Sequence, residues 1–444
     1  MVLGRPSNIT AAPIKLLMTS PRSAAIISSS LSHKTGNGVD PLDVITKYGA
    51  DALRFGITKL CTETQDVRLP VQFECPHCNT LMDQTKKNRT LPVVECKKCN
   101  ENFSTQWAQT DEDKAVPRGA SVSDKFEEGG KFGNKLWNVS RLALMNLDGY
   151  EAAPLADDEL AFEDRWILSR LSTVTENVTR GLETYKYAEV ARELYDFAWN
   201  EFCSVYAEMT KGRFEDPAKR ATTQRVMAYV LDTLLRLLHP IMPFLTEEIW
   251  QMLDKVAPQR GLAEIETASE SICIAAWPDV EKSRQDATLE SQFSKFQDVL
   301  GAIREIRSRQ SIAPREKIEF SVTCETTMTE LLQPMEPFFV SMAKATNVGW
   351  GTEVKPFATG ATKSVSGADV HVDLKDFINE EAEKARLLKE AERLEKGISG
   401  KEKKLSNEKF VARAPAEVVE QEKKALAELK AELDKVRASL KALG

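Results

Sequence analysis

Two closely spaced pairs of cysteines constrain the fold of this chain more than any other feature of its sequence. Cys75 and Cys78 form one pair, Cys96 and Cys99 form the other, and 17 residues separate the pairs. Two tight turns with this spacing can present four sulfurs tetrahedrally to one metal ion, at about 2.3 Å. We therefore expect these cysteines to hold a structural zinc ion, with free or disulfide-prone thiols as the alternative. Four ligands close the coordination shell, so a catalytic role for the metal is not expected.

The overall composition is that of an ordinary soluble protein. The 444 residues are 42% apolar and 29% charged, and this length predicts three or four domains. No stretch approaches the roughly 18 consecutive apolar residues of a membrane span, so we expect no membrane partner. The net charge of -7 argues against general affinity for nucleic acids, and DNA is not an expected partner. Residues 380–444 carry a net charge of +2, so a polyanion should prefer this end.

Helical periodicity dominates the chain, and the predicted fold class is mainly α. Apolar residues recur at helical spacing from about residue 123, and Pro240 and Pro243 should interrupt the most apolar helix. We predict six segments. They are an irregular N-terminal segment (1–39), a helical element (40–70), a zinc-knuckle insertion with a linker (71–122), a helical bundle (123–270), a small α+β module (271–376) and a coiled-coil arm (377–444).

Heptad spacing predicts the structure of the C-terminal arm. One apolar seam steps by alternating intervals of three and four residues, and a weaker seam precedes it. The first is Leu426, Leu429, Leu433, Val436, Leu440 and Leu443, and the weaker one is Leu387, Ala391, Leu394, Ile398 and Leu405. Pro415 lies between the seams, where one continuous helix would be costly. An antiparallel coiled-coil hairpin is therefore predicted.

Several stretches in this order resemble one family. GNGVDPLDVITKYGADALRF (36–55) is similar to the segment after the lysine-rich signature loop of class I aminoacyl-tRNA synthetases. GKFGNKLWNVSR (130–141) and HPIMPFLTEEIWQ (239–251) resemble the anticodon-binding bundle of the valyl, isoleucyl and leucyl enzymes. The arm, with NEKFVARAPAEVVEQE (407–422), looks like the tRNA-binding arm of the valyl-tRNA synthetase family. The resemblance makes 40–70 a stem-contact element and 123–270 an anticodon-binding bundle.

The resemblance implies a set of tRNA-binding residues. On the bundle these are Lys135, Trp137, Asn138 and Arg141, and on the arm they are Lys401, Lys403, Lys404 and Arg413. A solvated coiled-coil face with ion pairs is the alternative for the arm charges. The signature loop, by contrast, is degenerate: His33 and Lys34 stand near the place of its second lysine. We therefore expect no confident catalytic residue.

The family reaction is ATP-dependent attachment of valine to its tRNA, with ATP and Mg²⁺ as cofactors besides zinc. The resemblance begins near Gly36, so we expect a C-terminal portion that binds tRNA(Val) and is inactive alone, or active with an N-terminal catalytic half in trans. A stand-alone tRNA-binding or regulatory protein is the alternative. The first 39 residues resemble a transit peptide in composition, but an abnormal start is the preferred interpretation, and cytoplasmic localisation is expected.

Overall fold

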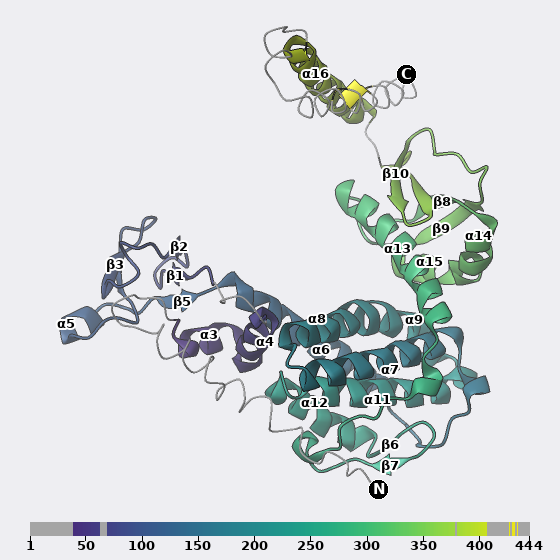
Figure 1. The fold of residues 1–444 in the computed structure, drawn as a ribbon, viewed down its shortest axis with the longest axis horizontal. Helices are drawn as coiled ribbons and strands as arrows, with labels where there is room; N and C mark the ends of the chain where they lie inside the picture. Colours follow the sequence, from purple (N-terminus) through teal and green to yellow (C-terminus); the bar gives the residue numbers. More distant parts are fainter. Residues whose placement is uncertain are drawn as a thin grey trace. The chain divides into compact units, whose positions relative to one another are not determined.

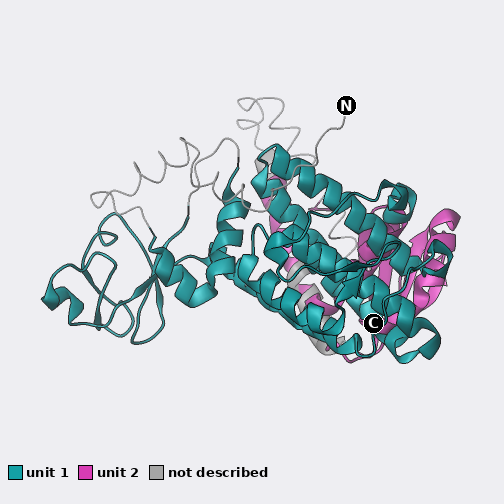
Figure 2. Cartoon of the chain, turned by 90° about the horizontal axis from the view of Figure 1, so that it is seen from below, with its two compact units in different colours: residues 1–290 teal, residues 291–444 magenta. Residues whose placement is uncertain are grey.

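The computed structural model describes residues 39–62, 69–377 and 380–405, and four further positions, Leu426, Leu429, Lys430 and Leu433. Within 380–405, the described side chains are those of Leu388 and residues 391–402. Figure 1 shows the fold of the chain, which forms two compact units, residues 1–290 and 291–444 (Figure 2). Helices dominate, and the predicted mainly α fold class is confirmed. No helix in these ranges is long and apolar enough to cross a membrane.

The first unit begins with two short helices, α3 (Pro41–Tyr48) and α4 (Ala50–Leu60). Asp40 caps α3 by accepting a hydrogen bond from the Leu42 amide at 2.9 Å. Gly49 separates the helices with φ of +93°, a conformation that favours glycine. The glycine therefore allows the chain to turn between the two helices.

The cysteine region is a small β-rich part of the first unit. Its antiparallel sheet has the order β2 (Leu81–Asp83), β1 (Gln72–Glu74), β5 (Ala120–Val122), and β3 (Val93–Glu95) pairs with β4 (Asn102–Ser104); a short helix, α5 (Asp111–Lys114), follows. Phe73, Met82, Val94 and Phe103 are buried around the cysteines. This core is small for the number of residues it must order, so a cross-link or metal would add stability that burial alone does not supply.

Packed helices form the bundle of the first unit (Figure 1). They are α6 (Glu127–Asn146), α7 (Phe162–Glu183), α8 (Tyr187–Tyr195), α11 (Pro217–Leu238) and α12 (Pro243–Val256). A π-helical stretch, Asp196–Tyr206, continues α8 into α9 (Ala207–Met209), and α10 (Lys211–Glu215) follows. A short hairpin of β6 (Gln259–Arg260) and β7 (Glu266–Thr267) comes after α12. Most side chains of the second half of α11 are buried, as its nearly continuous apolar pattern predicts.

The break between α11 and α12 lies where the prolines predict it. α11 ends at Leu238, and Pro243 occupies the first turn of α12, where its missing N–H costs no helical hydrogen bond. His239 lies in this joint and is 7% exposed, and both of its ring nitrogens have hydrogen-bonding partners. His239 is therefore a buried histidine with a partner at each ring nitrogen.

Helix α4 is attached both to the start of α12 and to the turn that follows α11. The Asp51 carboxylate accepts hydrogen bonds from the Phe244 and Leu245 amides at the start of α12, at 3.3 and 2.6 Å. The Arg54 guanidinium donates to the carbonyls of Pro240 and Ile241, just after α11, at 2.8 and 3.0 Å. The negative charge of Asp51 therefore lies at the N-terminus of α12, and the positive charge of Arg54 lies near the C-terminus of α11. Both positions are favourable for the dipoles of these helices.

The second unit contains most of α13 (Ala287–Arg309) and a four-stranded sheet. The strand order is β10 (Gly360–Val365), β11 (Ala368–Asp373), β8 (Ile318–Cys324), β9 (Ala345–Trp350). β8 and β9 are parallel, and α14 (Thr326–Leu332) and α15 (Glu336–Ala343) connect them. The helix at 287–309 and three of these strands are predicted by the sequence, whereas β10 is not. The first unit extends to Glu290, beyond the boundary after residue 270 that the sequence pattern suggests.

Helix α16 (Glu380–Leu405) begins the C-terminal arm. Its residues Ala391, Leu394 and Ile398 form a buried cluster with Leu433, and Leu426 and Leu429 pack against this cluster. Lys430 pairs with Glu402 at 2.7 Å. The two predicted seams therefore meet at these positions. Pro415 and the turn around it lie outside the described residues, so the complete hairpin stays a prediction.

Candidate functional site

The four paired cysteines converge on one point. Their Sγ atoms all lie within 4.8 Å of one another. Cys75 Sγ is 3.7 Å from Cys99 Sγ, and Cys78 Sγ is 3.6 Å from Cys96 Sγ. Sulfurs bound tetrahedrally to zinc at about 2.3 Å would be about 3.8 Å apart. The spacing and chemistry of the four thiols therefore fit a zinc ion.

Two equivalent turns produce this convergence. Each turn has the sequence Cys-x-x-Cys-Asn, and its asparagine, Asn79 or Asn100, adopts positive φ (56° and 58°). In each turn the asparagine amide donates to the carbonyl of the first cysteine at 2.9 Å. Asparagine tolerates the left-handed conformation better than most residues. The local sequence therefore closes both turns so that two sulfurs point the same way.

The surroundings of the thiols favour a metal over a catalytic role. His77 is exposed, and its Nε2 lies 3.2 Å from the Asn102 carbonyl oxygen, so it is not positioned as a fifth ligand. The hydrogen bond with the Thr80 hydroxyl, aided by the Thr80 backbone, lowers the pKa of Cys78 to about 6. A thiol that ionises readily is a better ligand for zinc, because zinc binds the thiolate.

The α6 residues predicted to bind tRNA do not all share one environment. Asn138 and Arg141 are exposed, one helical turn apart, and are available to a ligand. Trp137 is half-buried. Lys135 is also half-buried, and its Nζ donates to Ser204 Oγ at 2.5 Å and lies 4.1 Å from the centre of the Trp199 ring.

Lys135 belongs to a cluster of cations and aromatic rings that sequence reasoning missed. Trp199 stacks on Tyr195, with ring centres 5.5 Å apart and an angle of 12° between the planes. Lys59 of α4 lies 5.0 Å from the Tyr195 ring centre and pairs with Glu128 at 2.6 Å. The cluster joins α4, α6, the last residue of α8 and the π-helical stretch. Its only signal in the sequence is the helical spacing of Tyr195 and Trp199, which core packing also produces.

Of the arm residues, only Lys401 has a described side chain, and it is half-buried. Lys403 and Lys404 lie on α16, with side chains outside the described set. Arg413, His33 and Lys34 also lie outside the described residues. The placement of these five side chains therefore stays a prediction.

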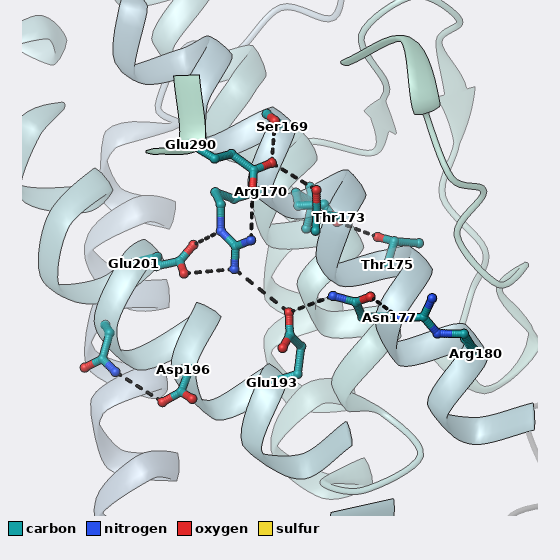
Figure 3. Close-up of polar contacts among 12 residues, drawn as sticks. Ser169, Arg170, Thr173, Thr175, Asn177, Arg180, Glu193, Asp196, Glu201 and Glu290 are labelled. Carbon is teal, nitrogen blue, oxygen red and sulfur yellow. Dashed lines mark hydrogen bonds and ion pairs between the residues drawn. The ribbon is translucent and has the colours of Figure 1, made fainter. Parts of the chain in front are cut away.

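A half-buried ion network joins α7, the π-helical stretch and the start of α13 (Figure 3). The Arg170 guanidinium donates to both oxygens of Glu201, at 2.8 and 3.0 Å, and to Glu290 at 3.0 Å. Glu290 also accepts hydrogen bonds from Ser169 and Thr173, at 2.6 and 2.9 Å. Each carboxylate therefore has charge-assisted partners, and the network fixes the first turn of α13 against α7.

Comparison with known proteins relates this chain to one family of enzymes. Residues 164–324 match the family model of the anticodon-binding domain of tRNA ligase, and residues 380–444 match that of the valyl tRNA synthetase tRNA-binding arm. The valine–tRNA ligase of Rhodopirellula baltica is 48% identical over 438 residues, which cover 98% of this chain and 42% of that protein. Those of Bacillus subtilis and Thermotoga maritima are 34% and 32% identical and cover 88% and 89% of this chain.

The helical bundle and the matched anticodon-binding domain define the class, which is that of the aminoacyl-tRNA synthetases. The arm and the relatives narrow it further. The chain belongs to the valine–tRNA ligase family and corresponds to a C-terminal portion of such an enzyme. It spans 42% of the length of the Rhodopirellula protein and 38% of that of the Bacillus protein.

Proposed function

We propose that this chain serves as the tRNA-binding portion of a valine–tRNA ligase, which attaches valine to tRNA(Val) at the expense of ATP. One observation carries the proposal. Two family models, both described as tRNA-binding parts of such enzymes, match the same chain in succession, and valine–tRNA ligases align with almost all of it. By this proposal ATP and Mg²⁺ bind in another part of the ligase, which the relatives contain outside the matched region. That part would belong to the same polypeptide or would act in trans.

The exposed residues of α6 would contact the anticodon loop. Arg141 can pair with a phosphate or with a base edge, and the Asn138 amide can both donate to and accept from a base. Single-stranded loops of RNA are recognised in this way because their bases are unstacked and their edges are accessible. Lys135 would act indirectly, since its contacts with Ser204 and Trp199 hold α6 against the π-helical stretch.

The arm would contribute contacts that do not depend on sequence. Lys401, Lys403 and Lys404 belong to a segment of net positive charge within an acidic protein. Lysines that neutralise phosphates release counterions, which supplies affinity without reading bases. The bundle would therefore provide selectivity, and the arm would provide much of the binding strength.

For the cysteine region we propose a structural zinc ion bound by Cys75, Cys78, Cys96 and Cys99. The distances between the sulfur atoms support this, as does the small apolar core around them. With four protein ligands, the zinc would have no open position for a substrate or water. It would fix the two turns and thereby the sheet next to α3.

The proposal is tested by measuring the affinity of the zinc-loaded chain for tRNA(Val), for tRNA(Val) with a changed anticodon, and for another tRNA. We expect the changed anticodon to weaken binding by roughly 1–3 kcal/mol for each base that is altered. Asn138→Ala and Arg141→Ala should reduce that selectivity, whereas Lys219→Ala, an exposed cation at the start of α11, should not. Equal affinity for all three RNAs would contradict the proposal.

A further inference from the structure

An exposed cysteine contacts the buried histidine between α11 and α12. All eight cysteines of the sequence lie in the described part of the chain, and Cys273 alone among them is exposed. It belongs to a short 3-10 turn (Ile272–Ile274) that packs against α12. Cys273 Sγ lies 3.3 Å from His239 Nε2, within hydrogen-bonding distance for sulfur. An accessible thiol therefore faces a potential proton acceptor.

The hydrogen bonds of Thr246 determine which nitrogen of His239 is protonated. Thr246 Oγ1 lies 2.8 Å from the Met242 carbonyl and can only donate to it, because a carbonyl has no proton. Its lone pair then accepts from His239 Nδ1, also at 2.8 Å. With the proton on Nδ1, Nε2 of the neutral ring carries a lone pair directed at Cys273. The Cys273 thiol is thus the donor, and His239 is the acceptor.

Charged groups from two neighbouring helices face this pair. Burial lowers the pKa of His239, Glu247 of α12 opposes this effect, and Arg54 of α4 adds to it. The Glu247 carboxylate also accepts hydrogen bonds from Ser271 Oγ and the Ile272 amide, at 2.9 and 3.1 Å, which fix the turn carrying Cys273. Asp51, the other acid at this joint, is occupied by the first amides of α12. The ring is therefore kept neutral and the thiol is held against it.

We propose that Cys273 is a reactive thiol and a modification site for small disulfides, with His239 as its proton acceptor. The Cys273 proton passes to His239 Nε2 while the sulfur attacks one sulfur of the disulfide. A new sulfur–sulfur bond forms, the old one breaks, and the leaving thiolate takes up a proton from the imidazolium or from water. The disulfide is the oxidant, and no other electron acceptor is required.

Cys273 should be more reactive than the other cysteines because of its exposure and its contact with His239. Cys203 and Cys324 are buried, so a reagent cannot reach them. Burial raises the pKa of Cys61, which reduces its reactive thiolate form. The four paired cysteines would be occupied by zinc. Cys273 combines exposure with an aligned acceptor, and it should therefore react first.

The test measures the rate at which 5,5′-dithiobis(2-nitrobenzoate) modifies the zinc-loaded full chain, with the site identified by peptide mass spectrometry. A Cys273→Ser variant gives the background. In His239→Gln the Cys273 rate should fall about tenfold near pH 6.5, where a free thiol is mostly protonated. Near pH 9.5 the two rates should agree within about twofold, because hydroxide in solution can then remove the thiol proton in place of the imidazole. Thr246→Val removes the fixed proton position and should give an intermediate rate at the lower pH.

Three results would overturn the proposal. An unchanged Cys273 rate in His239→Gln near pH 6.5 would make the histidine a bystander. A rate changed equally at both pH values would show altered access rather than proton transfer. If His239→Gln does not fold, Thr246→Val decides, and a wild-type rate in that variant near pH 6.5 would refute the assignment. None of these results depends on tRNA binding, so they are independent of the proposed function.

Discussion

At the scale of single residues, the joint between α11 and α12 depends on side chains from a distant part of the sequence. Asp51 performs the function of an N-cap for α12 although it lies on another helix, because Met242, the residue at that position, has no side-chain acceptor. Arg54 satisfies the carbonyls of Pro240 and Ile241, which lie between the end of α11 and the start of α12. The two residues together hold α4 on the bundle.

Replacement of Asp51 tests this role. We expect Asp51→Ala to lower the free energy of unfolding by about 1–2 kcal/mol, the usual cost of losing a helix cap. Asp51→Asn should cost less, since its amide oxygen can still accept one of the two hydrogen bonds. Urea denaturation followed by far-UV circular dichroism measures both. Equal stability of Asp51→Ala and the wild type would show that water replaces the carboxylate at no cost.

A second residue, His371, links stability to pH. It is 3% exposed, its ring nitrogens each lie 2.8 Å from a hydroxyl, of Thr323 and of Thr362, and burial lowers its pKa. Below the unfolded-state pKa of about 6.5, the unfolded chain takes up a proton that the folded sheet resists. Stability should therefore fall as the pH drops below that value, by at most about 1.4 kcal/mol per pH unit for this group.

The variant His371→Gln should show a weaker pH dependence, since glutamine can replace both hydrogen bonds but does not titrate. Hydrogen exchange of the β11 amides, corrected for intrinsic rates, at about pH 7.5 and 5.5 gives the local stability. The same decrease in protection in both proteins would mean that other groups cause the effect. Lys375 and the acidic residues near the sheet are the same in both proteins, so their contribution to the pH dependence is the same in both.

At the scale of secondary-structure elements, α16 combines an apolar seam with a charged surface. Ala391, Leu394 and Ile398 bury one side of the helix, so charged residues at other positions remain toward solvent. Some of these charged residues pair with each other within the arm, as Lys430 does with Glu402. The remaining lysines determine whether the arm binds RNA or is only a solvated coiled coil.

Charge reversal distinguishes these possibilities. Lys401, Lys403 and Lys404 changed together to glutamate should weaken tRNA binding and flatten its dependence on salt, by roughly one unit of log–log slope for each phosphate that is no longer neutralised. The same reversal at Lys317, Lys355 and Lys375, exposed lysines of the second unit, is the matched control. If both triple variants show the same decrease in affinity and slope, the effect is one of net charge, and the specific role of the arm is refuted.

At the scale of the whole molecule, the cysteine region is a small cooperative part on a larger helical unit. It is tied to α3 by polar contacts: Arg118 pairs with Asp40 and Asp43 at 2.7 and 3.0 Å, and the Ser121 amide donates to Asp43 at 2.9 Å. The bundle has its own large core and needs no metal to bury it. Removal of the proposed zinc ion should therefore affect one part of the molecule and spare the other.

Chelation of the metal tests this separation. We expect a zinc chelator, or Cys96→Ser, to remove one zinc per chain and to abolish hydrogen-exchange protection in residues 71–122. Protection in α7 and α11 should remain within experimental error. Cys203→Ser, which changes a thiol in the bundle, is the control and should keep its zinc. Unchanged metal content in Cys96→Ser would exclude the proposed ligand set.

Much of this organisation could be predicted because it depends on local sequence. The Cys-x-x-Cys-Asn turns, the break at Pro240 and Pro243, and the division at Gly49 each follow from the backbone preferences of a few adjacent residues.

Strand β10 could not be predicted in this way. It lies at the edge of its sheet, and its side chains alternate between exposed and half-buried, so its pattern lacks the apolar signal that identifies β8 and β11.

The sequence by itself determined the helical class, the two cysteine pairs, the apolar seams and the family, because spacing along the chain encodes periodicity and turn chemistry. Only the tertiary structure decided that Asp51 caps α12, that Lys135 bonds to Ser204 and that Cys273 faces His239. These pairs are separated by 34 to 194 residues in the chain. Such contacts depend on how helices pack against one another, and no local pattern records that geometry.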